Sequence, residues 1–215
     1  MALEALGSAL YFSRPPLPNI YIRLDVDDPF LEETKNNLLL LCKEYQTNCS
    51  ILVGPHTIKG NVPYLNDAAK AAYLDGSDLI VQLDDDQSFR TPYWNNLYCD
   101  AAAKVRRGIG VLATESVEND SQFVRPPSVT RRWYEIYGSF YCSDYIHFCA
   151  DTEINEIAHE ANKFFLVPGV EIKHNKIKDA TAKAIRNDKT RLKDGLTFES
   201  RKEIRKHLVM RMVSE

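Results

Sequence analysis

The chain has 215 residues, of which 44% are hydrophobic, and its formal net charge at neutral pH is −3. This composition excludes a disordered chain, and the length predicts a single domain. The slightly acidic balance excludes a general attraction to nucleic acid or to anionic membranes, and no window approaches the roughly 18 apolar residues of a membrane span. The five cysteines show no CxxC pair, and residues 1–16 lack the features of a signal peptide. The sequence therefore predicts free thiols in a reducing cytoplasm.

The first half of the chain alternates between predicted helices and predicted strands. A short helix is predicted at 2–11, before the Pro15-Pro16 pair, and amphipathic or alanine-rich helices are predicted at 29–45 and 65–74. Runs of β-branched, aromatic and aliphatic residues predict strands at 20–24, 49–53 and 79–83. This alternation is typical of a parallel sheet connected by crossover helices.

The second half is less regular. Helices are predicted at 92–107, 154–162 and 201–212, and strands at 109–113, 164–167 and 170–172. Residues 114–137 are predicted to be irregular, and they hold the Pro126-Pro127 pair. The whole pattern predicts an α/β fold with a mixed, mostly parallel central sheet that is flanked by helices.

Two groups of carboxylates follow predicted strands. The apolar run 79–83 ends in Asp84, Asp85 and Asp86, and the strand 20–24 ends in the group Asp25, Asp27 and Asp28. Adjacent carboxylates repel one another unless a cation lies between them, and Mg²⁺ and Mn²⁺ prefer such oxygen ligands. Because ligands gather at the carboxyl ends of strands in open α/β sheets, both groups are expected to face one crevice. A solvated acidic turn is the alternative, but the expected convergence favours a metal with a polyphosphate ligand.

Several motifs, in this order, resemble the nucleotide-sugar-dependent glycosyltransferases of the GT-A fold, of the family-2 type. They are Gly60, Asn66, the turn Asp75-Gly76-Ser77-Asp78, the triplet Asp84-Asp85-Asp86, Trp94, and the downstream segment FCADTEINEIAHEANKFFLVPGVEIKHNK. The resemblance covers about residues 19 to 175. The chain departs from the family at its start, because the first strand, which helps to clamp the nucleotide base, is missing or altered. This departure leaves the contacts to the base open.

The resemblance implies a Rossmann-like GT-A domain over residues 1–215. Its nucleotide-binding half would span about 1–90, its acceptor half about 91–185, and a C-terminal helix or lid about 186–215. The compact chain and the variant RLDVDDP also resemble the glycosyltransferase domains of large DNA viruses, including those of chlorella viruses that decorate a capsid glycan. That resemblance implies a location in the host cytoplasm.

The resemblance also implies a divalent metal site. Asp86 would bind Mn²⁺ or Mg²⁺, Asp84 would reach the ribose or, through water, the metal, and His174 would be a further metal ligand. Because an imidazole suits Mn²⁺ better than Mg²⁺, manganese is favoured. Asp85 belongs to the same nucleotide-binding group, but in an extended backbone its side chain points away from both neighbours, so a structural role is expected.

Other residues are candidates for contacts with the nucleotide. Asp25 and Asp27 would contact the uridine, and Lys59 and Gly60 would approach the nucleotide. Arg23 would touch the diphosphate or, as the favoured alternative, pair with the neighbouring acids.

Asp151 aligns with the aspartate that serves as the general base in inverting members of the family. The hydroxyl of the acceptor must lose its proton as it attacks C1 of the sugar, and a nearby carboxylate can accept that proton. Glu153 is the alternative base, Asp144 is a further candidate near the acceptor, and Asp151 could instead cap a helix. Because Ala150 stands where the family often has glutamate, a retaining outcome stays open.

The expected activity is therefore metal-dependent transfer of a sugar from a UDP-sugar to a hydroxyl of a glycan or glycoprotein acceptor. A sugar-phosphate nucleotidyltransferase is an alternative, although no GxGTR-like phosphate loop is present. A noncatalytic module that binds carbohydrate or a cation is another alternative. The charged tail, 186–215, is expected to be a solvated helix, or else a lid whose residues Lys189, Arg191 or Lys193 neutralise the pyrophosphate.

Overall fold

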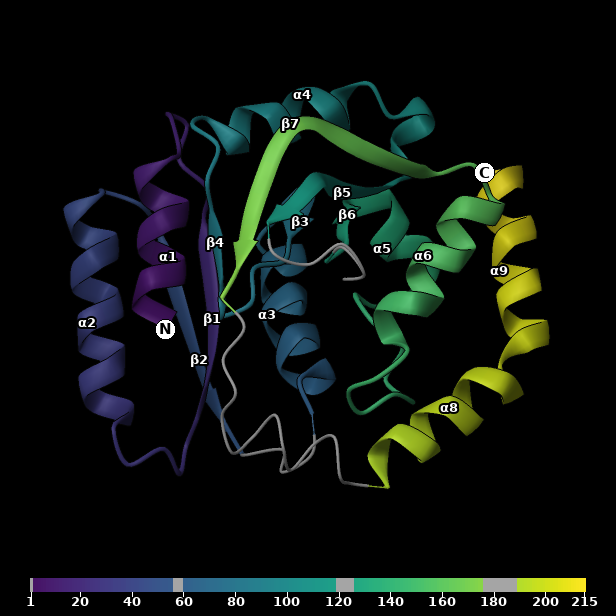
Figure 1. The fold of residues 1–215 in the computed structure, drawn as a ribbon, viewed down its shortest axis with the longest axis horizontal. Coiled ribbons are helices and arrows are strands. Elements are labelled where there is room, and N and C mark those ends of the chain that lie inside the picture. Colours follow the sequence, from purple (N-terminus) through teal and green to yellow (C-terminus); the bar gives the residue numbers. More distant parts are fainter. Residues whose placement is uncertain (1, 56–59, 119–125, 176–188) are drawn as a thin grey trace.

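The computed structural model describes residues 2–55, 60–118, 126–175 and 189–215 (Figure 1). It shows a mixed α/β protein in which a curled sheet is flanked by helices. The α-helices are α1 (Ala2–Tyr11), α2 (Leu31–Glu44), α3 (Val62–Leu74), α4 (Trp94–Ala103), α5 (Arg131–Tyr137), α6 (Ala150–Glu160), α8 (Thr190–Ser200) and α9 (Lys202–Ser214). The strands are β1 (Ile20–Asp25), β2 (Cys49–Gly54), β3 (Leu79–Val81), β4 (Gln87–Phe89), β5 (Val111–Glu118), β6 (Ser128–Thr130) and β7 (Phe164–His174).

The described strands form two sheets. β1 and β2 pair in parallel, as expected for two strands joined by a helix. The larger sheet has the order β3-β6-β5-β7-β4, and in it β5 and β7 are parallel whereas the other neighbouring pairs are antiparallel. The sheet is therefore mixed, and the prediction of a mostly parallel sheet is not confirmed. One cause is β4, which begins a few residues after β3 without a crossover helix between them.

β7 is one continuous strand where the sequence predicted two. Pro168 and Gly169 suggested a break, but Gly169 adopts a left-handed conformation with φ of 76°, and the pairing with β5 shifts register between Thr114 and Ser116. The amide of Gly169 donates to Oε2 of Glu115 at 2.7 Å. A bulge thus lets the strand bend and continue (Figure 1). As a result β7 reaches as far as β4.

The region 114–137 is more ordered than predicted, in the parts that the structure describes. β5 extends into it, and β6 leads directly into α5. Thr130 ends β6 and caps α5, because its hydroxyl accepts a hydrogen bond from the amide of Trp133 at 3.3 Å. The short strands β4 and β6 and the helix α5 were not predicted. α8 lies in the tail that was expected to be a solvated helix, but it buries Thr190 and Asp194.

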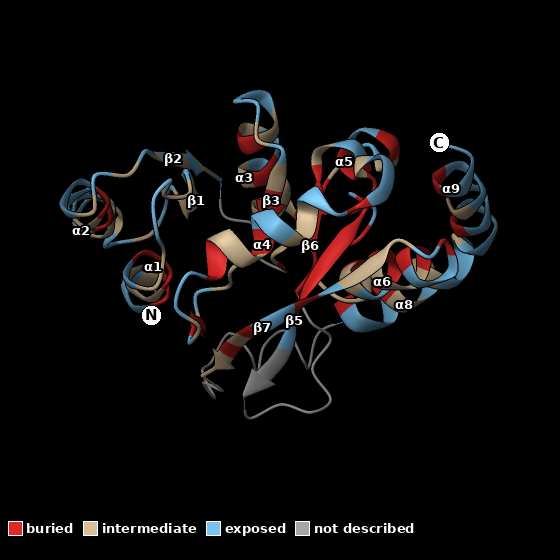
Figure 2. Cartoon of the chain, turned by 90° about the horizontal axis from the view of Figure 1, so that it is seen from above, coloured by how far each residue is buried: buried red, intermediate tan, exposed pale blue. Residues whose placement is uncertain are grey.

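Helices cover the small sheet on both faces. α1 and α2 bury Leu6, Leu10, Leu38 and Cys42 against apolar residues of β1 and β2. Seen from above, α1 and α2 lie on one side of this sheet and α3 on the other (Figure 2). This apolar burial supplies the main stabilisation of the three layers.

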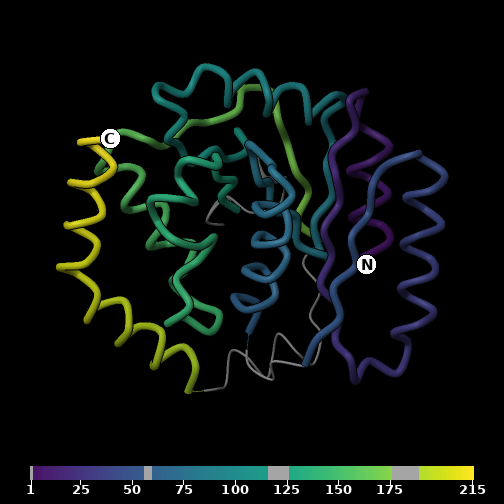
Figure 3. The backbone as a smooth tube through the Cα atoms, turned by 180° about the vertical axis from the view of Figure 1, so that it is seen from behind, coloured from purple at the N-terminus to yellow at the C-terminus, as the bar shows by residue number. Residues whose placement is uncertain are grey.

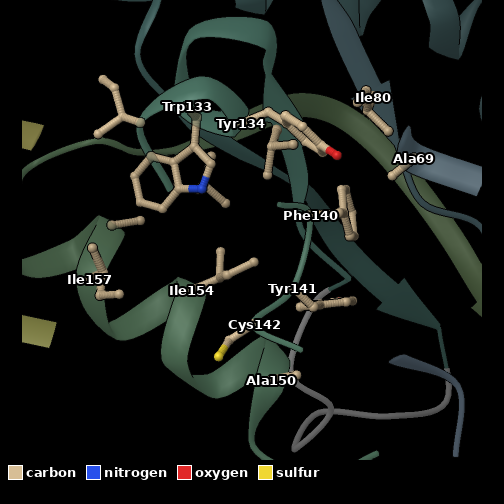
Figure 4. Packing of buried hydrophobic residues seen from close by; sticks show 14 of the residues in the cluster. Ala69, Ile80, Trp133, Tyr134, Phe140, Tyr141, Cys142, Ala150, Ile154 and Ile157 are labelled. Atoms are coloured by element: carbon tan, nitrogen blue, oxygen red, sulfur yellow. The ribbon is translucent and has the colours of Figure 1, made fainter. Parts of the chain in front are cut away.

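A second core lies where α5, α6 and α9 meet. Trp133 is fully buried, and Ile154 and Ile157 of α6 point towards it (Figure 4). α9 adds Met212, which is also fully buried. The C-terminal helix is therefore part of the core, and it lies at the opposite end of the molecule from α2 (Figure 3). No helix among the described residues is long and apolar enough to cross a membrane.

Candidate functional site

The pairing of β4 with β7 brings two predicted metal ligands together. Gln87 of β4 lies opposite His174, the last residue of β7, so Asp86 is next to the imidazole. Nε2 of His174 lies 3.1 Å from Oδ2 of Asp86, and the amide of Asn175 donates to the carbonyl of Asp86 at 2.7 Å. Both side chains are partly buried, with His174 15% and Asp86 33% exposed.

Asp84 is held beside this pair by two amides. Its Oδ1 accepts from Nε2 of Gln82 at 2.8 Å, and its Oδ2 accepts from Nε2 of Gln87 at 2.9 Å. Burial, together with the charges of Asp86 and Asp85, raises the pKa of Asp84 to about 6, although the bond from Gln82 acts in the opposite direction. Each oxygen of Asp84 thus accepts one hydrogen bond from a side-chain amide and has a second lone pair for a further donor, whereas Asp85 is exposed.

The Asp86–His174 pair fits two positions of a metal site. Two ligands on adjacent corners of an octahedron, each about 2.1 Å from the ion, lie about 3 Å apart, which is close to the separation observed here. Among the described residues, no group of three or more His, Cys, Asp or Glu side chains is arranged to hold a metal ion. A metal that arrives with a nucleotide does not need such a cage, because it takes one or two protein ligands and fills its other positions with phosphate oxygens and water.

Tyr141 connects the surroundings of Asp84 with those of the candidate base Asp151. Its hydroxyl donates to Oε1 of Gln82 at 2.7 Å. Asn66 fixes the backbone of Tyr141, because its Nδ2 donates to the carbonyl at 2.9 Å and its Oδ1 accepts from the amide at 2.8 Å. Burial, and then the charges of Asp151 and Asp84, hold the pKa of Tyr141 well above its usual value. The charges of Asp151 and Asp84 therefore both act on the same phenol.

Asp151 lies in the first turn of α6 and is partly buried. Its Oδ1 accepts from the amide of Thr152 at 2.7 Å. Burial raises the pKa of Asp151, and the hydrogen bonds from Thr152 oppose that rise. A raised pKa gives this carboxylate a higher affinity for a proton than an ordinary aspartate has, which suits a general base.

Glu153 is a structural residue in this fold, which argues against its role as the alternative base. Its carboxylate is fully buried and accepts hydrogen bonds from the hydroxyls of Tyr137 and Tyr145, both at 2.7 Å. Arg201 forms an ion pair with it at 3.0 Å and also binds the exposed Asp144 at 2.8 Å. Because its oxygens are buried and enclosed by these donors, Glu153 is the weaker of the two candidate bases.

Arg23 forms an ion pair with Asp25, a member of the acid group at the end of the strand β1. Its guanidinium lies 3.3 Å from Asp25 and 3.3 Å from Asp67, and it donates to the carbonyl of Pro55 at 2.7 Å. The Arg23 side chain is 4% exposed, so the geometry agrees with the ion pair rather than with contact to a diphosphate. Asp27 is exposed, and the contacts of Asp25 and Asp27 with a uridine stay predictions.

Gly60 packs against the segment that precedes α6. A Cβ atom at this position would lie 2.1 Å from the carbonyl oxygen of Ile146. The close approach explains why a glycine is needed here, whereas its contact with a nucleotide stays a prediction. Lys59 lies outside the described residues. Lys189, Arg191 and Lys193 are exposed at the start of the tail.

The sequence analysis missed several residues that shape the site, namely Gln82, Gln87 and Tyr141. Gln82 left a signal, because it is the one polar residue of the run 79–83 and stands two positions before Asp84. Gln87 donates to Asp84 only three positions away, whereas Tyr141 is recognisable only from its long-range hydrogen bonds. Comparison of the chain with protein-family models, with curated proteins and with solved structures found no significant match.

Proposed function

We propose that this chain is a metal-dependent glycosyltransferase of the GT-A type, which moves a sugar from a UDP-sugar to a hydroxyl group of a glycan or glycoprotein acceptor. The observation that supports this proposal most strongly is the approach of His174 to Asp86, at 3.1 Å, beside the half-buried carboxylate of Asp84. An imidazole and a carboxylate at this separation form a donor set that suits Mn²⁺.

Asp86 and His174 would hold the metal through Oδ2 and Nε2. When bound, the ion neutralises the negative charge on the departing nucleoside diphosphate. Asp84, oriented by Gln82 and Gln87, would accept hydrogen bonds from the ribose. These residues would thus bind and orient the donor.

Asp151 would act on the acceptor. It would accept the proton of the acceptor hydroxyl while the oxygen forms a bond to C1 and the bond between C1 and the phosphate oxygen breaks. The raised pKa of Asp151 makes its carboxylate a stronger base than an exposed aspartate. One displacement of this kind inverts the configuration at C1. A retained configuration in the product would exclude this role for Asp151.

Calorimetric titration with UDP, with and without Mn²⁺, tests the proposal. We expect UDP to bind to the wild-type protein in a metal-dependent manner and the Asp86→Ala variant to lose this binding. The exposed Asp100 on α4 provides a matched control, and Asp100→Ala should bind UDP as the wild type does. Metal binding without nucleotide binding would instead identify a cation-binding module. UDP affinity that is equal with and without metal would contradict the assignment of Asp86 and His174.

Product analysis separates the two enzyme classes. A glycosyltransferase should release UDP from a UDP-sugar in the presence of a suitable acceptor. A sugar-phosphate nucleotidyltransferase should instead form the nucleotide sugar and pyrophosphate from UTP and a sugar 1-phosphate. The second result would overturn the proposed reaction while leaving the metal site intact.

A further inference from the structure

Asp194 of α8 binds a row of backbone amides that belongs to another part of the chain. Its carboxylate is fully buried. Oδ1 accepts from the amide of Ile146 at 3.1 Å, and Oδ2 accepts from the amides of His147 and Phe148 at 2.9 Å and 2.7 Å. Burial of a carboxylate is costly unless it is hydrogen-bonded, and these three bonds provide the compensation.

The segment 146–148, which we call the anchored loop, leads directly into the start of α6. Cys149 follows it in a left-handed conformation, with φ of 65°, and Asp151 lies in the first helical turn. The carbonyl of Ile146 accepts from the amide of Val62 at 3.2 Å. The anchored loop therefore joins α8, the start of α3 and the start of α6.

The same pair of C-terminal helices also holds the chain just after Asp151. Arg201, between α8 and α9, forms the ion pair with the buried Glu153, two residues beyond Asp151. Asp194 thus fixes the backbone before Asp151, and Arg201 fixes a side chain after it. Contacts on both sides restrict the position and direction of the first turn of α6.

The imidazole of His147 lies in this arrangement as well. Burial lowers the pKa of His147 below its usual value, and the charges of Asp194 and Asp151 oppose this shift. The amide of His147 donates to Asp194, and His147 stands four positions before Asp151, so the three residues belong to one short stretch of contacts.

We propose that Asp194 is a positioning residue for Asp151, and that α8 holds the anchored loop so that the carboxylate of Asp151 keeps its orientation towards the acceptor. This inference rests on the proposed function of Asp151. It also assigns a role to the described part of the tail. α8 and α9 hold the chain on either side of Asp151, whereas the sequence analysis considered a closing lid.

The Asp194→Asn variant tests this proposal. An asparagine keeps one carbonyl oxygen but presents an NH₂ group to the amides, so at least one of the three hydrogen bonds is lost. We expect kcat to fall on the order of 10-fold to 100-fold, because small misplacements of a reacting group have effects of this size. The KM for the UDP-sugar and the Mn²⁺-dependent affinity for UDP should stay unchanged. Glu199→Gln, at an exposed position of the same helix, is the matched control and should keep the wild-type kcat.

Two structural measurements accompany the kinetics. Hydrogen exchange should show strong protection of the amides of 146–148 in the wild type and loss of protection in Asp194→Asn. The carboxyl titration of Asp151, followed by NMR, should shift between the two proteins. If Asp194→Asn does not fold, Asp194→Glu keeps the charge and moves the carboxylate by one methylene group, and the same measurements apply to it.

The outcomes distinguish this inference from the proposed function. A variant that loses amide protection but keeps the wild-type kcat and the wild-type titration of Asp151 would overturn the positioning role. A parallel loss of kcat, UDP affinity and thermal stability would also overturn it, because it would indicate a general structural defect. If the wild-type protein neither binds UDP nor transfers a sugar, the proposed function fails. The shift in the Asp151 titration then still decides whether Asp194 positions that side chain.

Discussion

The imidazole of His174 lies 3.1 Å from the carboxylate of Asp86, although 88 positions of the sequence separate the two residues. The antiparallel pairing of β4 with β7 creates this approach, because it places His174 opposite Gln87. The bulge at Gly169 lets β7 extend far enough to make the contact. The separation matches that of two adjacent ligands of one octahedral ion.

Replacement of His174 by alanine should weaken the Mn²⁺-dependent binding of UDP by at least about tenfold, since removal of a group that orients a metal typically has an effect of this size. The preference for Mn²⁺ over Mg²⁺ should also decrease, because the remaining ligands are oxygen atoms. Calorimetry with each metal measures both effects. His207→Ala, at an exposed position of α9, is the control. Unchanged UDP affinity in His174→Ala would remove the imidazole from the site.

Replacement of Asp151 by asparagine should lower turnover on the order of 10²-fold or more while the affinity for UDP stays the same, because the role proposed for the side chain concerns the acceptor and not the donor. Steady-state kinetics together with UDP titration separate the two effects. Wild-type turnover in this variant would show that Asp151 is not the base.

The pH dependence of kcat should report the raised pKa of Asp151. The base must be deprotonated, so kcat should fall as the pH drops through this pKa, and the fall should begin above the usual range for an aspartate. Stability should change with pH in the opposite direction to kcat. The contribution of Asp151 to the free energy of unfolding is fully present below the pKa of this group in the unfolded chain, and it is lost as the pH rises through the pKa in the folded protein. Rate profiles and thermal melts over the same pH range test the two signs. If kcat instead fell only in the pH range of an ordinary aspartate, the expected effect of the raised pKa on the rate would be contradicted.

Glu153→Gln should destabilise the fold by about 3–5 kcal/mol, because it removes the buried partner of an ion pair and leaves Arg201 with only the exposed Asp144. Chemical denaturation measures this change. Glu203→Gln, which alters an exposed pair with Lys206, should leave the midpoint of denaturation nearly unchanged. A Glu153→Gln variant that keeps the stability of the wild type but loses its activity would restore Glu153 as a catalytic candidate.

Gly60→Ala should destabilise the protein by about 1–3 kcal/mol, since the added Cβ would overlap the carbonyl oxygen of Ile146. Gly7→Ala in α1 is the matched control. The added Cβ meets no heavy atom within 4 Å there, so the helix should gain about 0.5–1 kcal/mol. Thermal denaturation of both variants tests the comparison, and equal midpoints would contradict the close packing at Gly60.

Much of the secondary structure follows from the sequence alone, because apolar periodicity and turn residues act over one helical turn or one strand. The helices α1, α2, α3 and α6 and the strands β1, β2 and β3 lie where the pattern of side chains predicts them. The position of Asp84, Asp85 and Asp86 at the end of an apolar run, and the position of His174 after another, are also local features. The sequence therefore identifies the candidates for the site.

Only the tertiary structure decides which of these candidates meet. The direction of β4, the continuity of β7, the pairing of Arg23 with Asp67 and the burial of Glu153 beneath Arg201 all depend on partners that lie tens of positions away. A carboxylate in the sequence is equally able to bind a metal, accept a proton or pair with an arginine. Which of these roles it has depends on its burial and on the hydrogen-bond donors that surround it in the folded chain. These are properties of the packing and not of any local pattern.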